Sequence, residues 1–178
     1  AERLSRIYNE ESDLGNLFAD VHREEGGAQI GLYISGGIRR DIAAGAVTVR
    51  DLLDAYPFID EVLTIELSGA RILKVLEQSL SLERGMMQVS GITVRYDLER
   101  PIGSRVLGVQ VGGKALREDA TYSVAVGRFL LNGGDLFTAF LNSKVISVGR
   151  DFADALTDYF KSREVVGMPV RGRLLPEH

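Results

Sequence analysis

Three segments of the chain place apolar residues at the spacing of an amphipathic helix. Each follows a residue that commonly caps a helix, namely Ser12, Ser68 and Asp151. The first segment runs as far as the pair Gly26-Gly27, which is typical of a helix end. The apolar positions that recur every three or four residues are Leu14, Leu17, Phe18 and Val21 in the first segment, Ile72, Leu73, Leu76 and Leu80 in the second, and Phe152, Ala155, Leu156, Tyr159 and Phe160 in the third.

Shorter patterns predict one more helix and several strands. The segment "VTVRDLLDAYPF" predicts a short strand and then a helix over residues 49–55. The helix stops before Pro57, because proline disfavours helical geometry in the residue before it. Leu63, Ile65 and Leu67 alternate with polar residues, as in a half-buried strand. Further strands are predicted over residues 28–34, 88–98, 105–111, 121–127 and 144–148, and in the tail "MPVRGRLLPEH".

These helices and strands are interspersed without regular strand–helix–strand alternation. The order predicts an α/β chain of the α+β type, in which a mixed sheet is sandwiched with helices. The sequence contains no internal repeat, low-complexity tract or linker-like region. We therefore expect residues 1–178 to form a single domain.

Composition excludes several classes of function. The chain is 45% hydrophobic and 26% charged, which is ordinary for a globular protein, and its formal charge of -4 offers no general attraction to nucleic acid or to an anionic membrane. No apolar run approaches the roughly 20 residues of a membrane span. The lack of cysteine excludes a disulfide framework, a thiolate zinc site and a cysteine nucleophile. We expect neither a nucleic-acid partner nor a membrane span.

The two histidines do not predict a metal site. His178 is the last residue, and His22 lies in the segment "HREEGG" at a polar helix end. Metal sites built on imidazole need several converging ligands. We therefore expect no metal ion in this chain.

Three loops beside the predicted strands carry the residue types of a ligand site. They span residues 35–39 ("SGGIR"), 56–58 ("YPF") and 129–135 ("FLLNGGD"). Glycine pairs let backbone amides approach a ligand, and an arginine supplies a planar fork for phosphate or carboxylate. Alternatively, the glycines only make tight turns and Arg39 pairs with Asp41 or Asp60. The residues alone leave both interpretations open.

Five ordered motifs give the chain a recognisable resemblance. The strings "ESDLGNLFADV", "ISGGIRRDIAAGAVTVRDLLDAYPF", "LTIELSGARILKVLEQS", "QVSGITVRYDL" and "FLLNGGDLF" occur in this order. In order and spacing, the chain resembles the C-terminal domain of the 5'-nucleotidase family, which includes periplasmic UDP-sugar hydrolases and ecto-5'-nucleotidases. The resemblance covers nearly the whole chain.

This resemblance implies a role within a larger enzyme. In the family, an N-terminal metallophosphoesterase domain carries two divalent metal ions and the nucleophilic water, and the C-terminal domain binds the nucleotide and sets specificity. Nothing in this sequence resembles the metal-binding domain. We expect a full-length hydrolase that dephosphorylates nucleotides, nucleotide sugars or cyclic nucleotides in the periplasm or at the cell surface, and an isolated chain that is inactive.

The resemblance also implies roles for individual residues. Phe58 and Phe129 match two rings that clamp the nucleobase, and Asp135 matches an acid that accepts hydrogen bonds from ribose. Arg39 matches an arginine that reaches the substrate phosphate and assists catalysis, whereas Phe137 is expected in the core. Further substrate-binding positions implied by the resemblance are Gly37, Asn132, Gly133 and Gly134, and Arg6 as a second phosphate-binding arginine.

Two departures from the family pattern support an alternative. Ile34 replaces an asparagine that is common in the family, and Leu136 follows Asp135 where glycine is usual. An isoleucine offers no hydrogen bond to a base. The alternative function is a non-catalytic scaffold or interaction module with a degenerate pocket.

Overall fold

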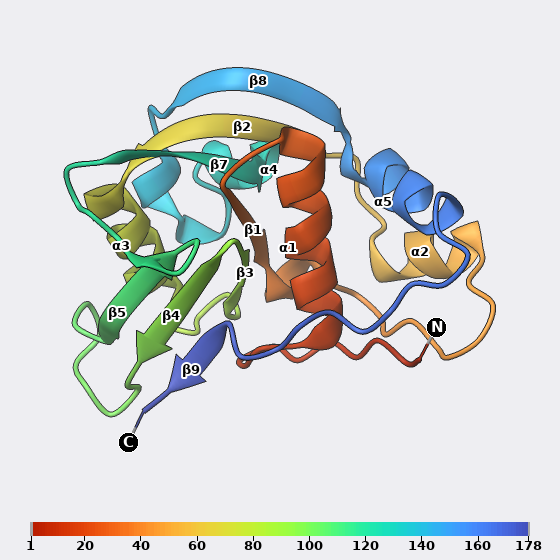
Figure 1. Cartoon of the computed structure of the whole chain (residues 1–178), viewed down its shortest axis with the longest axis horizontal. Coiled ribbons are helices and arrows are strands. Elements are labelled where there is room, and N and C mark those ends of the chain that lie inside the picture. Colours follow the sequence, from red (N-terminus) through yellow and green to blue (C-terminus); the bar gives the residue numbers. More distant parts are fainter. Residues whose placement is uncertain (1, 178) are drawn as a thin grey trace.

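A five-stranded mixed sheet lies at the centre of the structure, a computed structural model that describes residues 2–177 (Figure 1). Within it, the strands formed by residues 30–34 and 121–127 run parallel, and the other neighbouring strands are antiparallel. In spatial order the strands are β3 (Met87–Ser90), β1 (Ile30–Ile34), β7 (Thr121–Gly127), β2 (Glu61–Ser68) and β8 (Lys144–Asp151).

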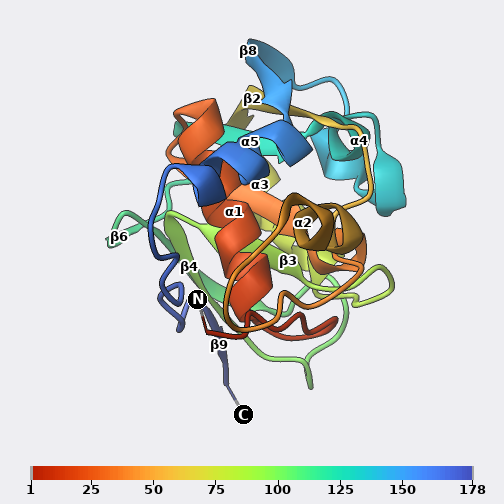
Figure 2. The same cartoon turned by 90° about the vertical axis from the view of Figure 1, so that its right-hand side faces the viewer.

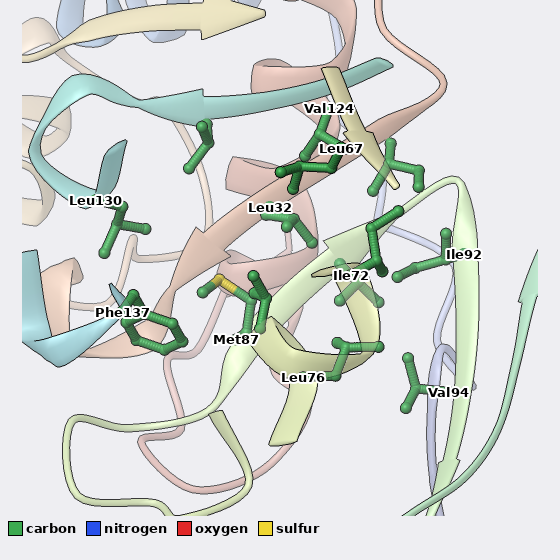
Figure 3. Packing of buried hydrophobic residues seen from close by; sticks show 14 of the residues in the cluster. Leu32, Leu67, Ile72, Leu76, Met87, Ile92, Val94, Val124, Leu130 and Phe137 are labelled. Carbon is green, nitrogen blue, oxygen red and sulfur yellow. The ribbon is translucent and has the colours of Figure 1, made fainter. Parts of the chain in front are cut away.

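A smaller sheet of four strands packs with one face of the larger sheet. In spatial order it consists of β6 (Lys114–Ala115), β5 (Val106–Val111), β4 (Ile92–Tyr96) and β9 (Leu174–Pro176). Helix α3 (Gly69–Ser79) shares a buried apolar cluster with both sheets, which Figure 3 shows through labelled residues such as Leu32, Ile72 and Val94. The expected arrangement of a mixed sheet covered by helices is confirmed, with a second sheet added.

Three helices cover the opposite face of the larger sheet (Figure 2). They are α1 (Asp13–Gly26), α2 (Val49–Ala55) and α5 (Phe152–Lys161). Alternation along β1 explains the two faces: Leu32 and Ile34 join the cluster with α3, whereas Tyr33 points to α1, with its ring centroid 5.0 Å from that of Phe18. The helices that begin after Ser12, Ser68 and Asp151 are confirmed, since each of these side chains accepts a backbone N–H in the first helical turn.

Two predicted strands are wrong. The strand expected over residues 88–98 is broken into β3 and β4 at Gly91, whose φ is +78° and where a Cβ would collide with the carbonyl oxygen of Gln29. The short strand expected just before α2 is absent because Thr48 instead caps this helix. The Thr48 N–H donates to Asp51 Oδ2 over 2.8 Å, and Asp51 N–H donates to Thr48 Oγ1 over 3.3 Å.

The helices within residues 2–177 include none with the length and apolar character needed to cross a membrane. His178 lies outside the described residues, so its expected lack of a metal-binding role is not addressed by the structure.

Candidate functional site

Strand direction brings the three predicted loops to one edge of the larger sheet. Because β1 and β7 are parallel neighbours, the loops after Ile34 and after Gly127 leave the sheet at the same edge. Strand β2 is antiparallel to β7, and its Val62 pairs with Gly127, so the loop that leads into β2 lies at this edge as well. The topology therefore assembles a site from loops that are distant in the sequence.

A cleft of about 410 Å³ opens among these loops, a volume typical of small-molecule sites. Five of the predicted site residues line it: Gly37, Arg39, Phe58, Phe129 and Asp135. Other residues in its walls include Tyr8, Tyr33, Ile34, Asp60 and Arg84. The cleft thus combines aromatic surface with side chains of both charges.

Phe58 and Phe129 present aromatic surface to this cleft. Their exposed fractions are 37% and 52%, although phenylalanine is usually buried. Tyr56 packs against Phe58 in a T-shaped arrangement, with ring centroids 5.4 Å apart, and the guanidinium of Arg39 lies 5.0 Å from the Phe58 ring centroid. The two rings are therefore available to a planar ligand, and a cation lies next to one of them.

The Gly133-Gly134 pair lets the chain turn back over the Phe129 ring. Gly133 has a φ of +82°, a conformation that favours glycine. A Cβ on Gly134 would lie 2.6 Å from atoms of the Phe129 ring, which leaves no room for a side chain. The N–H of Phe129 donates to Asp60 Oδ1 over 3.0 Å and joins this segment to the loop before β2.

Asp135 lies half-buried at the cleft, and the next residues return to the core. Asp135 and Leu136 both have positive φ values, 51° and 66°, so Leu136 adopts a conformation that favours glycine. Phe137 is only 2% exposed and packs in the cluster that also contains Leu130 and Met87 (Figure 3). The predicted core position of Phe137 is confirmed.

Arg39 does not form the ion pairs that the alternative interpretation requires. Asp41 instead binds Arg3, with 2.6 Å between Oδ2 and Nη2, and Asp60 accepts the N–H of Phe129. Within residues 2–177, Arg39 has no carboxylate partner at ion-pair distance, and its guanidinium contacts Phe58. A positive charge thus remains at the cleft for an anionic ligand.

Four predicted site residues are not in the walls of the cleft. Arg6 lies outside it and supports the loop, because its Nη1 donates to the carbonyl oxygen of Ile38 over 3.0 Å. Asn132 ends helix α4 (Arg128–Leu131), and its N–H donates to Arg128 O over 3.1 Å. Gly133 and Gly134 shape the loop as described above. Direct substrate contact by these four residues stays a prediction.

Sequence reasoning missed two charged residues of the cleft. Asp60 follows Phe58 by two positions, but as a single acidic residue it carries no pattern beyond a possible pairing with Arg39. Burial raises the pKa of Asp60 to about 6, opposed by the hydrogen bond from the Phe129 N–H. Arg84 follows α3 and belongs to no sequence motif. Together with Asp135 it also lines a neighbouring hollow of about 270 Å³. Only the tertiary structure places Arg84 in the site.

His22 lies near the polar C-terminal end of α1, as expected, but its side chain is buried. It is 2% exposed, its Nδ1–H donates to the carbonyl oxygen of Phe18 over 3.1 Å, and its ring centroid lies 4.1 Å from that of Phe152. The face of α1 that carries His22 is turned toward α5. Burial lowers the pKa of His22 to about 4, so the imidazole is neutral at physiological pH.

This pKa predicts acid sensitivity that depends on His22. The unfolded chain, with a pKa near 6.5, binds a proton before the folded chain does, so this contribution to stability is complete above pH 6.5 and is lost as the pH falls toward 4. The loss by pH 4 is about 3 kcal/mol. Urea unfolding at pH 7.5 and pH 4 should show this loss of unfolding free energy in the wild type and not in His22→Phe.

The pH dependence of stability that comes from Asp60 has the opposite sign. Its pKa is raised in the folded chain, so ionisation of Asp60 destabilises the fold as the pH rises. Wild type and His22→Phe share Asp60, so the difference between them isolates His22. Equal pH dependence of unfolding in the two proteins would contradict the burial of a neutral imidazole.

The described part of the chain, residues 2–177, contains no group of three or more histidine or acidic side chains placed to hold a metal ion. The aromatic and charged side chains that line the cleft can supply stacking, hydrogen bonding and charge neutralisation by Arg39 and Arg84.

Comparison with known proteins places this architecture in a family. The family model for the 5'-nucleotidase C-terminal domain matches residues 2–142. The solved structure of a 5'-nucleotidase precursor from Thermus thermophilus has a TM-score of 0.92 at 34% identity, and the match covers 98% of this chain and 38% of that one.

Two curated relatives extend the comparison. A trifunctional nucleotide phosphoesterase from Bacillus subtilis is 36% identical over 75% of this chain and 10% of its own length. A cell wall protein from Listeria monocytogenes is 28% identical over 90% of this chain and 22% of its own length. The chain spans only 10% to 34% of the length of the first three curated relatives. Since the family model matches most of its residues, this chain belongs to the family of 5'-nucleotidase C-terminal domains.

Proposed function

We propose that this chain is the substrate-binding and specificity domain of a metallophosphohydrolase that dephosphorylates nucleotides. The observation that carries this proposal is the shared cleft, to which separate loops contribute the partly exposed rings of Phe58 and Phe129, the carboxylate of Asp135 and the guanidinium of Arg39. Relatives named as 5'-nucleotidase and nucleotide phosphoesterase support it.

Each of these groups suits one part of a nucleotide. The Phe58 and Phe129 rings would hold the nucleobase, since stacking on aromatic side chains contributes about 1 to 3 kcal/mol per base and tolerates any base. A carboxylate such as Asp135 can accept two hydrogen bonds from the vicinal hydroxyls of ribose. Arg39 would bind the phosphate and neutralise charge that develops on it during transfer.

Hydrolysis would require a second domain. An N-terminal metallophosphoesterase domain with two divalent metal ions would supply the activated water, and this chain would deliver the substrate to it. The short span of the match within the longer relatives supports this division. We also propose a periplasmic or cell-surface location, which is supported by the Listeria relative named as a cell wall protein.

Calorimetry of the 178-residue chain with adenosine and AMP tests the proposal. Arg39→Ala should weaken AMP binding about tenfold, because a hydrogen-bonded charge contributes roughly 1.5 kcal/mol, and should change adenosine binding less than about twofold. The matched control is Arg40→Ala, a neighbouring exposed arginine that pairs with Asp54 over 3.5 Å. Failure of the wild type to bind either ligand at millimolar concentration would instead favour a scaffold with a degenerate pocket.

A further inference from the structure

The segment that carries Asp135 is strained at two consecutive residues. Asp135 has φ 51° and ψ 29°, and Leu136 has φ 66°, so both adopt the left-handed conformation. Residues other than glycine persist there only when surrounding contacts hold them. Since Asp135 lies at the cleft, the contacts that hold this segment also determine where its carboxylate lies.

Gln78, on helix α3, makes the nearest of these contacts. Its Nε2 donates to Thr138 Oγ1 over 2.7 Å and to the carbonyl oxygen of Leu136 over 3.4 Å. Its Oε1 accepts the N–H of Ala139 over 3.1 Å. One side-chain amide therefore holds the backbone on both sides of Phe137, directly after Asp135.

Arg71 holds the far end of the same segment. It lies seven residues before Gln78 and therefore on the same face of α3. Its Nη2 donates to the carbonyl oxygens of Ala139 and Leu141, each over 2.7 Å, and its Nε donates to Ala139 O over 3.1 Å. With Arg71 fixing this end and Phe137 fixed in the core, Gln78 is the side chain that acts next to the strained residues.

We propose that Gln78 is a positioning residue that holds the carboxylate of Asp135 at the cleft for recognition of the ribose hydroxyls. This inference rests on the proposed function, because it assumes that Asp135 binds ribose. Without Gln78, the backbone at residues 135 and 136 is free to return to an unstrained conformation, which turns Asp135 away from the sugar. Gln78 is not among the residues that line the cleft, although it lines the neighbouring hollow together with Asp135. Its hydrogen bonds reach the loop at Leu136, Thr138 and Ala139.

The test compares adenosine with 2',3'-dideoxyadenosine, which lacks both ribose hydroxyls. Dissociation constants are measured by calorimetry on the 178-residue chain. The wild type should bind adenosine about tenfold more tightly than the dideoxy compound. In Gln78→Ala this ratio should fall to about one or two, while the affinity for the dideoxy compound stays within about twofold of the wild type.

Two variants separate positioning from general loss of structure. Thr138→Val removes the shortest loop contact of Gln78 at an exposed residue and should lower the ratio in the same direction. Lys74→Ala, an exposed change on the same helix, should leave the ratio unchanged. If Gln78→Ala does not fold, Thr138→Val carries the test.

The possible failures are distinguishable. A wild type that binds the two ligands equally would contradict ribose recognition by Asp135, and the inference would fail with it. A wild type that discriminates, together with Gln78→Ala and Thr138→Val variants that discriminate equally well, would overturn the positioning role alone and leave the proposed function standing.

Discussion

Replacing Phe137 with alanine is expected to lower the free energy of unfolding by about 3 to 5 kcal/mol, the usual cost of removing a buried phenyl ring. Phe137 is 2% exposed and belongs to the cluster shared by the two sheets and α3. The surrounding backbone is held by Arg71 and Gln78, so the site has little freedom to collapse into the cavity. Urea denaturation of both proteins measures the difference.

Phe129→Ala provides the comparison within the same loop. Phe129 is 52% exposed, so its removal should change the free energy of unfolding by less than about 1 kcal/mol. Comparable losses in the two variants would show that the exposed ring also supports the fold, and would weaken its assignment to ligand binding.

Loss of either ring of the proposed clamp is expected to reduce adenosine affinity by about 1 to 3 kcal/mol, or about 5-fold to 150-fold. The effect should appear in both Phe58→Ala and Phe129→Ala, because the rings approach the cleft from different loops. Phe129→Trp should retain most of the affinity, since an indole also stacks on a base. Calorimetry with adenosine measures each constant.

Leu53→Ala is the control for these variants. Leu53 is 46% exposed on α2 and is not among the residues that line the cleft, so its removal should leave adenosine affinity unchanged. Full affinity in Phe58→Ala or Phe129→Ala would exclude the corresponding ring from base binding.

Local signals predict the helices and the loops of the site. Ser12, Ser68 and Asp151 cap helices because their side chains accept nearby backbone N–H groups, which depends on only a few neighbouring residues. Glycine pairs likewise predict the turns, because the backbone freedom of glycine depends on the residue itself. These features can therefore be predicted from the sequence before any tertiary contact is known.

Other features depend on distant contacts. The break at Gly91 reflects its close approach to the Gln29 carbonyl, and His22 is buried because α5 packs over it. Asp60 lies at the cleft, where it accepts a hydrogen bond from the Phe129 N–H. Arg84 lies at the cleft because the chain after α3 passes beside it. No spacing along the chain encodes these relations, so the sequence predicts the loops of the cleft better than its full set of charges.

We propose that the nucleobase binds between the rings of Phe58 and Phe129, which line the same cleft. Nuclear Overhauser effects between the base protons of adenosine and assigned phenyl protons of the 178-residue chain test it most directly. We expect contacts from the base to both rings, together with amide shifts at Gly37, Asp60 and Asp135. Contacts to neither ring, with amide shifts confined to β8 or to the smaller sheet, would contradict the claim.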